Sequence, residues 1–229
     1  MANEPSVAQI CLGANGQMPL RSVLPRTRAA LKARQPLTIV ALGSSSTRGV
    51  GASSWAATYP EVMERELMRL RPGIQLRIVN AGRNGETIPG QLARLDSDVL
   101  AYAPALVIWQ LGANDVVMPW GGMPEDLAAS VSTGIRHLKA AGADVVLMDM
   151  QRTPFITGAT QTPAMLALIT RVATETGAGH FPRFAMFERA EAAGAEPWAF
   201  TSWDGLHNSD AGYDCTGRAL ARAIHAALK

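Results

Sequence analysis

Residues 37–51 read LTIVALGSSSTRGVG, an apolar run that leads directly into a loop of small and polar residues. The run at 37–42 is short, rich in β-branched side chains and flanked by Pro36 and Gly43, a pattern typical of a buried β-strand. The loop at 43–51 contains three consecutive serines. This stretch therefore predicts a buried strand whose end carries polar, reactive side chains.

Strand-like and helix-like patterns alternate from this stretch to the end of the chain. Further strands are expected at residues 75–79, 105–111, 144–149 and 183–187, and helices at residues 55–70, 87–100, 125–141, 163–176 and 211–228. Strands that alternate with helices of similar length indicate a parallel sheet covered by helices on both faces. No internal repeat or interior linker interrupts the pattern. The sequence thus predicts one α/β domain over residues 37–229.

The first 36 residues lack this periodic pattern. They contain several prolines and glycines and a basic stretch at residues 26–34. We expect an extended N-terminal arm over residues 1–36, with one short helix near residues 27–32. Cys11 in this arm and Cys215 in the last helix are either free buried cysteines or a disulfide that ties the arm to the helix, and the sequence leaves both open.

The cysteines and the N-terminus both bear on the compartment of the protein. A disulfide forms and persists in oxidising compartments. No apolar stretch of secretory length follows Met1, so either the protein stays in the cytoplasm or its signal has been removed. We favour an extracytoplasmic location, periplasmic or secreted.

The composition is that of a globular domain. The chain has 229 residues, 48% hydrophobic and 17% charged, which is enough for a full core and too apolar for a disordered chain. Its 21 basic and 19 acidic residues leave a net charge of +2, too small for the electrostatic footprint of a nucleic-acid-binding protein. No apolar run approaches the roughly 20 residues of a membrane-spanning helix. We expect a small-molecule or carbohydrate partner, and neither nucleic acid nor a membrane.

Polar residues gather where the expected strands end. Ligands of open α/β sheets bind at the carboxyl ends of the strands. The loops there are rich in small, polar and titratable residues: GSSSTRGVG at 43–51, NAGRNGET at 80–87, GAND at 112–115 and SWDGLH at 202–207. Because the strands of a parallel sheet end at one edge, we expect these loops to form a single site.

The serine-rich loop at 43–51 has several interpretations. A P-loop needs a Gly-Lys pair and this loop has no Lys, while a dinucleotide fingerprint needs a third Gly where Ser54 stands. The loop is otherwise a strand-to-helix turn that holds a serine nucleophile, or a turn whose hydroxyls only cap a helix. The nucleophile is favoured because the other loops contain the groups that it would need.

A serine attacks an ester only when a base removes its proton and an acid orients the base. His207 has Asp204 three residues before it, which lets the carboxylate reach Nδ1 and leaves Nε2 free for a hydroxyl. The alternative is that the pair only caps the last helix. His137 and His225 lie in expected helices, and His180 has no acidic residue close to it in the sequence. Asp204 and His207 are therefore the candidate acid and base.

A tetrahedral intermediate also needs donors for its oxyanion. Asn114 offers a side-chain amide, and Gly85 offers a backbone N–H that a ligand can approach closely. The alternatives are that Asn114 is only a turn residue, and that Gly85 is present only because the backbone there has a positive φ angle. Metal binding through His207 would need more ligands than lie close by, so we expect no metal and no cofactor.

The loops match, in order and spacing, the motifs of a known family. The matching residues are Gly43-x-Ser45-x-Thr47-x-Gly49, Gly82-x-x-Gly85, Gly112-x-Asn114-Asp115 and Asp204-x-x-His207. Over residues 37–228 the chain resembles the SGNH (GDSL-type) hydrolases. The resemblance implies a flavodoxin-like, three-layer α/β/α fold around a five-stranded parallel sheet, and ester hydrolysis through a serine.

Carried over position by position, the resemblance assigns a role to five residues. Ser45 would be the nucleophile, and Asp204 and His207 would complete its triad. The oxyanion would be held by the backbone N–H groups of Ser45 and Gly85 and by the side chain of Asn114. The chain is thus expected to be a serine hydrolase that acts on carboxylic ester bonds.

The chain departs from the family pattern at the residue before the nucleophile. The family usually has Asp there, and this chain has Ser44. Ser44, Ser45 and Ser46 therefore compete for the nucleophile role, and only the motif spacing selects Ser45. Thr47 stands where a Gly-x-Ser-x-Gly elbow has Gly, which disfavours the α/β-hydrolase fold.

Tryptophans in the loops bear on the substrate. Trp120, Trp198 and Trp203 lie where they could line the site, and flat aromatic faces suit sugar rings; the alternative is that they anchor loops by packing. No long apolar lid stands out, which argues against long-chain lipids. We expect removal of short acyl groups, such as acetyl, from a carbohydrate. An acyltransferase with the same triad and a non-catalytic carbohydrate-binding domain are the alternatives.

Overall fold

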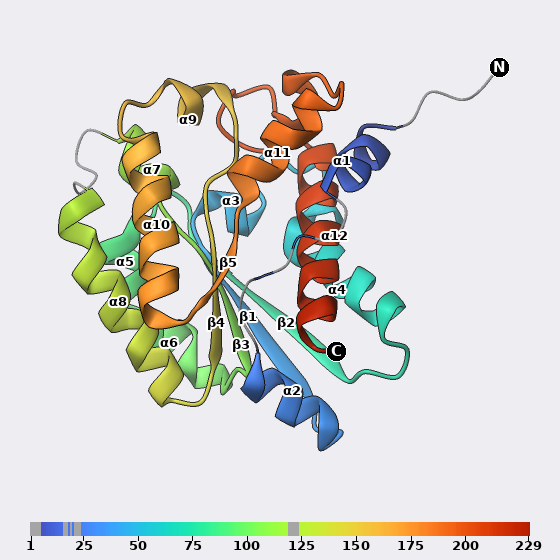
Figure 1. Cartoon of the computed structure of the whole chain (residues 1–229), viewed down its shortest axis with the longest axis vertical. Helices are drawn as coiled ribbons and strands as arrows, with labels where there is room; N and C mark the ends of the chain where they lie inside the picture. The colour runs from blue at the N-terminus through green and yellow to red at the C-terminus, as the bar shows by residue number, and fades with distance from the viewer. Residues whose placement is uncertain (1–5, 16–17, 19, 21–23, 119–123) are drawn as a thin grey trace.

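The described part of the chain folds around a central sheet of five parallel strands (Figure 1). The computed structural model describes residues 6–15, 18, 20, 24–118 and 124–229. The strands are β1 Leu37–Gly43, β2 Leu76–Gly82, β3 Leu106–Gln110, β4 Asp144–Met148 and β5 Gly179–Phe181. They lie in the order β2-β1-β3-β4-β5, and each adjacent pair is parallel. The expected parallel sheet is confirmed.

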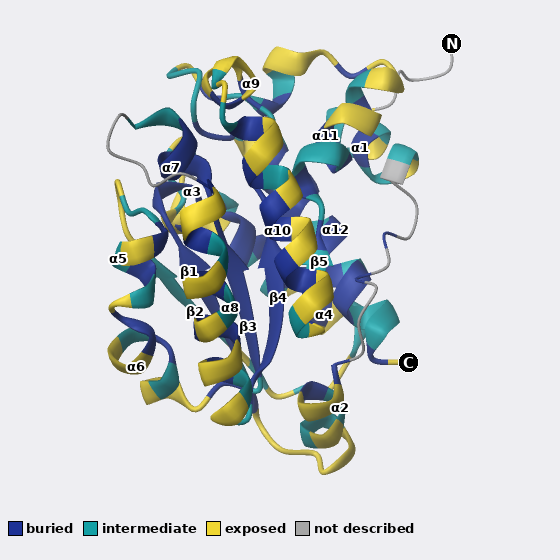
Figure 2. Ribbon diagram, turned by 60° about the vertical axis from the view of Figure 1, so that its left-hand side comes forward, coloured by how far each residue is buried: buried dark blue, intermediate teal, exposed yellow. Residues whose placement is uncertain are grey.

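The strands are apolar because helices cover both faces of the sheet. Side chains alternate between the faces, so Ile39 and Ala41 of β1 join one buried cluster while Val40 and Leu42 join the other. Every residue of β3 and β4 is buried. Strand β2 lies at one edge of the sheet and is only partly buried (Figure 2). Burial on both faces is the pattern of a parallel sheet in an α/β protein.

Two layers of helices enclose the sheet (Figure 1). One layer contains α1 Val7–Asn15, α4 Tyr59–Leu70, α11 Arg183–Ala192 and α12 Asp210–Ala227. The other contains α5 Ile88–Leu92, α6 Leu95–Asp98, α8 Pro124–Ala140 and α10 Thr162–Thr176. These layers and the strand order confirm the three-layer, flavodoxin-like α/β/α fold.

Short elements occupy the two ends of the sheet. At the carboxyl ends of the strands lie α3 Ser45–Arg48, α7 Ala113–Val117 and α9 Pro154–Gly158, whereas α2 Pro25–Lys32 lies at the opposite end (Figure 1). The 3₁₀ turns are η1 Trp55–Ala57, η2 Leu100–Tyr102 and η3 Pro197–Phe200. None of the described helices has both the length and the apolar character needed to cross a membrane.

The expected fifth strand at residues 183–187 is wrong. Strand β5 lies earlier, and residues 183–192 form helix α11. The residues that α11 buries are Arg183, Met186, Phe187 and Ala190, a spacing of three and four residues that belongs to a helix. Pro182 separates the strand from the helix, because it has no N–H to continue a ladder.

Two of the expected helices are interrupted. Residues 55–70 form η1 and then α4, and Pro60 in the first turn of α4 marks a new helix start. Residues 87–100 divide into α5, α6 and η2. The break falls at Arg94, whose buried side chain donates to the carbonyl of Gly43 at 3.1 Å. This tertiary contact overrides a helical pattern in the sequence. The helices expected at 125–141, 163–176 and 211–228 agree with α8, α10 and α12.

The described residues before β1 include two helices, where the sequence indicated an extended arm. Of those described, Val7–Asn15 and Pro25–Lys32 are helical, the second where a short helix was expected. Leu20 and Leu24 are buried in the core, and the backbone N–H of Thr27 donates to Asp144 Oδ2 at 2.8 Å. Segments this short have too few apolar residues to show a period, and tertiary contacts stabilise them instead.

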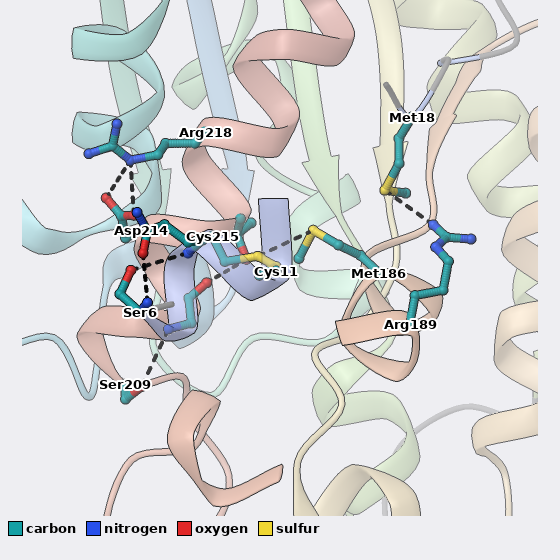
Figure 3. The surroundings of a disulfide bond; sticks show 12 residues. Ser6, Cys11, Met18, Met186, Arg189, Ser209, Asp214, Cys215 and Arg218 are labelled. Carbon is teal, nitrogen blue, oxygen red and sulfur yellow. Dashed lines mark hydrogen bonds and ion pairs between the residues drawn. A yellow bond between two sulfur atoms is a disulfide. The ribbon is translucent and has the colours of Figure 1, made fainter. Parts of the chain in front are cut away.

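A disulfide joins the first helix to the last (Figure 3). Cys11 of α1 and Cys215 of α12 are fully buried, and their Cα atoms lie 6.1 Å apart. The Sδ atom of Met186 in α11 lies 3.9 Å from Cys215 Sγ, so α1, α11 and α12 meet at this point. Of the two possibilities left open by the sequence, the structure has the disulfide.

Candidate active site

The polar loops meet at the carboxyl edge of the sheet. Because β1 lies between β2 and β3, the loops at 43–51, 80–87 and 112–115 are neighbours. The loop at 202–207 comes from the other end of the chain. A β-bridge between Thr201 and Asn208 closes its base. Sheet order and this closed loop therefore position the candidate site.

Ser45 occupies the first position of α3. Its side chain is nearly buried, and Ser44 before it is extended. The helix ends after one turn at Gly49, whose N–H donates to the Ser45 carbonyl at 2.9 Å. Gly43 permits this tight turn, because a Cβ atom there would lie 2.1 Å from Thr47 Oγ1. The sequence thus folds into a strand-to-helix turn that presents one hydroxyl.

Ser45, His207 and Asp204 are in direct contact. The Oγ atom of Ser45 lies 2.8 Å from His207 Nε2, and His207 Nδ1 lies 2.5 Å from Asp204 Oδ2. Gly51 lets the first loop approach this histidine, because a Cβ atom there would lie 3.0 Å from His207 Cβ, and its φ is +92°. The structure therefore brings together the three residues that the motif spacing selected.

Asp204 is held as a carboxylate. Its Oδ1 atom accepts the backbone N–H groups of Leu206 and His207, each at 2.9 Å, and the Ser202 hydroxyl at 3.2 Å. Burial opposes the charge, but the hydrogen bonds from His207 and Leu206 outweigh it and lower the pKa of Asp204 to about 2. An ionised carboxylate fixes the imidazole with Nε2 toward the hydroxyl.

The two other serines of the loop have different partners. Ser44 donates from its Oγ to Gln110 Oε1 at 3.0 Å. Ser46 Oγ lies 3.3 Å from Gln151 Oε1 and accepts from Arg183 Nη1 at 3.3 Å. Both of these hydroxyls are engaged below the surface, whereas Ser45 is bonded to an imidazole.

The segments that carry Asn114 and Gly85 are tied together, and Asn114 lies in α7. Asn114 Nδ2 donates to the carbonyl of Glu86 at 2.9 Å, which orients the amide and leaves its second N–H for a ligand. Asp115 Oδ1 accepts the backbone N–H of Ile88 at 3.0 Å. Gly85 has a φ of +70° and is exposed, and a Cβ atom there would meet nothing within 4 Å. Backbone conformation and not crowding therefore requires glycine at position 85.

A buried arginine that the sequence analysis did not single out links two parts of the site. Arg183 is fully buried and donates to Ser46 Oγ at 3.3 Å, to Gln151 Oε1 at 2.8 Å and to the Asp149 carbonyl at 3.0 Å. Gln151 Nε2 in turn donates to the carbonyl of Leu206 at 2.9 Å. Burial lowers the pKa of Arg183. One guanidinium thus connects the neighbour of Ser45 with the residue before His207.

A signal for this network was present in the sequence. Gln151 lies in the loop at 149–153, which follows the fourth strand and ends at the same edge of the sheet as the other polar loops. His180, which has no acidic neighbour in the sequence, has one in the structure, because its Nε2 lies 3.1 Å from Asp149 Oδ2. These two residues are far apart in the sequence and meet because β4 and β5 are adjacent.

The exposure of Trp198 and Trp203 does not fit the alternative that these tryptophans anchor loops by packing. Trp198 is 73% exposed and Trp203 is 97% exposed, so packing does not account for either. Trp203 directly precedes Asp204. Trp120, the other candidate for substrate binding, lies outside the described residues. Among the described side chains, no group of three or more potential ligands could hold a metal ion.

A model of one protein family matches nearly the whole chain. It is described as the Non-GDSL lipase-like family, and it covers residues 11–229. The description agrees with the departure at position 44, where the GDSL pattern has Asp and this chain has Ser44.

Similar proteins and structures agree with this match. Esterase TesA of Pseudomonas aeruginosa is 32% identical over 123 residues, 53% of this chain and 57% of that protein, so the match spans less than two thirds of TesA. An acetylxylan esterase of Geobacillus stearothermophilus is 26% identical over 209 residues, 82% of this chain and 90% of that protein. A crystal structure of a lipase/acylhydrolase from Enterococcus faecalis has a TM-score of 0.72 at 21% identity, over 84% of this chain and 97% of that chain. The resemblance to the SGNH-type hydrolases is confirmed.

Proposed function

This chain belongs to the Non-GDSL lipase-like family, and on that premise we propose that it is a serine hydrolase of carboxylic esters. One observation carries the proposal: Ser45 Oγ lies 2.8 Å from His207 Nε2, and His207 Nδ1 lies 2.5 Å from Asp204 Oδ2. A hydroxyl, an imidazole and a carboxylate in this order are what a serine nucleophile requires. The similarity to proteins named esterases supports the same chemistry.

Acylation begins with the Ser45 hydroxyl. His207 Nε2 takes the proton of Oγ as Oγ bonds to the ester carbonyl carbon, and Asp204 stabilises the imidazolium that forms. The negative charge on the carbonyl oxygen is held by the backbone N–H groups of Ser45 and Gly85 and by the free N–H of Asn114. His207 then gives its proton to the leaving alcohol, and an acyl-Ser45 ester remains.

Deacylation repeats these steps with water. His207 Nε2 removes a proton from a water molecule, whose oxygen attacks the acyl carbon of the Ser45 ester. The same donors hold the second oxyanion. The proton returns from His207 to Ser45 Oγ when the bond between Oγ and the acyl carbon breaks, and the carboxylic acid leaves.

Covalent labelling tests the proposal. We expect a fluorophosphonate to modify the wild-type protein at a single peptide, the one that contains Ser45. Ser45→Ala is expected to lose both labelling and esterase activity, while Ser44→Ala and Ser46→Ala retain labelling. Absence of labelling in the wild type would favour a non-catalytic carbohydrate-binding domain. Loss of labelling only in Ser44→Ala, or only in Ser46→Ala, would show that the substituted serine is the nucleophile.

For the substrate, we propose short acyl groups, acetyl above all, on a carbohydrate. The exposed indole of Trp203 beside Asp204 supports a sugar in the alcohol part. The similarity to a protein named acetylxylan esterase supports both parts. A panel of p-nitrophenyl esters of increasing chain length is expected to show the highest kcat/KM for acetate. A preference for decanoate would contradict the proposal.

We propose an extracytoplasmic location as well. The disulfide between Cys11 and Cys215 supports it, because such bonds persist in oxidising compartments. Native cells are fractionated to locate the protein, and a second sample is quenched in acid and alkylated under denaturing conditions. The protein is expected outside the cytoplasm with both cysteines unmodified. A cytoplasmic protein with alkylated cysteines would contradict this.

A further inference from the structure

A cavity opens beside the loop that carries Asp204, separate from the hydroxyl of Ser45. Its volume is about 760 Å³, within the range of roughly 300–1,000 Å³ that small-molecule sites occupy. Its walls come from α9, from η3, and from the loop before His207, including Ser202, Trp203 and Gly205. Ser202 Oγ donates to Asp204 at 3.2 Å, so the cavity wall touches the triad acid without containing Ser45 or His207.

The rim of this cavity is unusually aromatic for a surface. Trp198 and Trp203 line it, and they are 73% and 97% exposed. Phe155 of α9, also exposed, lies close by, because a Cβ atom on Gly205 would lie 3.3 Å from its ring. Large apolar side chains that contribute nothing to the core and gather at a hollow mark a binding surface.

The polar part of the cavity wall contains one positive and one negative side chain, so its net charge is zero. Arg152 and Glu191, both lining residues, form an ion pair through Nη1 and Oε2. Glu191 Oε1 is buried and has no hydrogen-bond partner among the described residues, so the cavity-facing part of the pair is its exposed edge. Arg152 also lies over the ring of Phe184, 5.6 Å from its centroid, which fixes the guanidinium. The wall thus carries one held ion pair, whose side chains are partly exposed, and no net charge.

These features select one class of occupant. An ionic ligand would meet charges that are already paired, and a fatty acyl chain would remove the ion pair from water without replacing its hydrogen bonds. A pyranose ring has apolar C–H faces that stack on an indole, and hydroxyls at its edge that bond to carboxylate and guanidinium groups. The aromatic rim and the neutral polar wall of the cavity together match the apolar faces and the hydroxyl edge of a sugar.

We propose that this cavity is a subsite for a sugar unit of the alcohol part of the substrate, one that lies away from the ester being cleaved. The inference rests on the proposed esterase function and extends it to an oligosaccharide or polysaccharide chain. Contacts made far from the reacting bond supply binding energy that a short substrate does not use. The preference of the enzyme should therefore rise with the length of the sugar chain.

Kinetics with substrates of different length test the subsite. The wild-type protein, Trp198→Ala, Trp203→Ala and the double variant are compared on p-nitrophenyl acetate and on acetylated xylo-oligosaccharides from the disaccharide to the hexasaccharide. Each single variant is expected to keep its kcat/KM on p-nitrophenyl acetate and to lose about two- to tenfold on the hexasaccharide, the range expected for one aromatic contact. Tyr102→Ala is the control, because Tyr102 is exposed but precedes β3 at the opposite edge of the sheet.

An equal loss of kcat/KM on p-nitrophenyl acetate and on the hexasaccharide would show that the tryptophans position the triad and do not bind sugar. That result would overturn the subsite. Unchanged kinetics on every substrate would overturn it as well. Calorimetric titration of Ser45→Ala with unacetylated xylohexaose and mannohexaose measures the subsite without turnover. Binding that Trp203→Ala abolishes would support the subsite even if the wild type hydrolysed no ester, whereas no binding of either glycan would reject it.

Discussion

At the scale of single residues, the three consecutive serines differ in role because their hydroxyls have different hydrogen-bond partners. Ser44 is bonded to Gln110 and Ser46 to Gln151 and Arg183, so only the hydroxyl of Ser45 faces an imidazole. The family motif selected the same serine by spacing. The structure adds the reason, which is that buried amide and guanidinium groups engage the other two.

Asn114 is the most direct test of the proposed oxyanion site. Loss of one such donor costs about 2.7–4 kcal/mol of barrier, so Asn114→Ala is expected to lower kcat by roughly a hundredfold or more while KM changes little. Steady-state kinetics on p-nitrophenyl acetate measures this. Near-normal turnover with an unchanged melting temperature would remove Asn114 from the mechanism.

Asp204 predicts a pH dependence of stability. Its pKa is lowered to about 2 in the folded protein, against about 3.9 in an unfolded chain. A lowered pKa means that the ionised form stabilises the fold above about pH 4, and that this contribution disappears as the pH falls toward about 2. The melting temperature of Asp204→Asn is therefore expected to lie below wild type at neutral pH and to converge with it in acid. A difference independent of pH would contradict the assignment.

Arg183 predicts a loss of activity at temperatures where the variant is still folded. Arg183→Met removes the donors to Ser46 and Gln151, and a small shift of reacting groups can cost about a hundredfold in rate. It also leaves the buried acceptors on Gln151 and the Asp149 carbonyl without a donor, which typically costs about 1–3 kcal/mol for each group. We expect kcat to fall between about tenfold and about a hundredfold, with KM little changed and a lower melting temperature. Arg183→Lys, which cannot reach all three acceptors, should restore only part of kcat.

At the scale of elements, the strands and helices that a local hydrophobic pattern determines could be predicted from the sequence. The strands at β1, β3 and β4 are buried on both faces, so they read as continuous apolar runs. Strand β5 is only Gly179–Phe181, which is too short to show a period, so a strand prediction falls instead on the apolar residues of α11. The break at Arg94 also depends on a contact with Gly43, which is 51 residues away in the chain.

The same distinction holds for the site. Asp204 and His207 are three residues apart, so their pairing could be predicted from spacing. Arg183 bonds to Ser46 across 137 residues, and no local pattern encodes such a contact. Only the adjacency of strands and helices in space brings these groups together.

The disulfide predicts a change in stability that belongs to the contact between α1 and α12. It closes a loop of 204 residues, and removal of a native disulfide typically costs about 2–5 kcal/mol. For a chain of this size that lowers the melting temperature by roughly 5–20 °C. Cys11→Ala is expected to melt lower by this amount with kcat unchanged, and dithiothreitol should bring the wild type to the same value. Equal melting of the variant and the wild type would show that the bond contributes nothing.

At the scale of the whole molecule, the sheet concentrates stability at its centre. β3 and β4 are buried throughout and β1 nearly so, whereas β2 is only partly buried at an edge. The candidate site lies on loops and short helices that follow the strands of this rigid centre, an arrangement that holds Ser45 and Asn114 fixed relative to each other.

Hydrogen exchange tests this distribution. Amides of β1, β3 and β4 are expected to exchange last, through global unfolding, and those of β2 earlier through local opening at the edge. Peptide-level mass spectrometry of the native protein measures both. Slower exchange in β2 than in β3 would contradict the assignment of the stable centre.

The bond between Cys11 and Cys215 has one more consequence, because these two residues bracket all five strands. A protease that nicks any surface loop between them leaves two polypeptides that stay covalently attached. On a non-reducing gel such a clipped protein would migrate near the intact chain, and only reductant would release the fragments. The protein would thus lose backbone continuity and still keep its two fragments together.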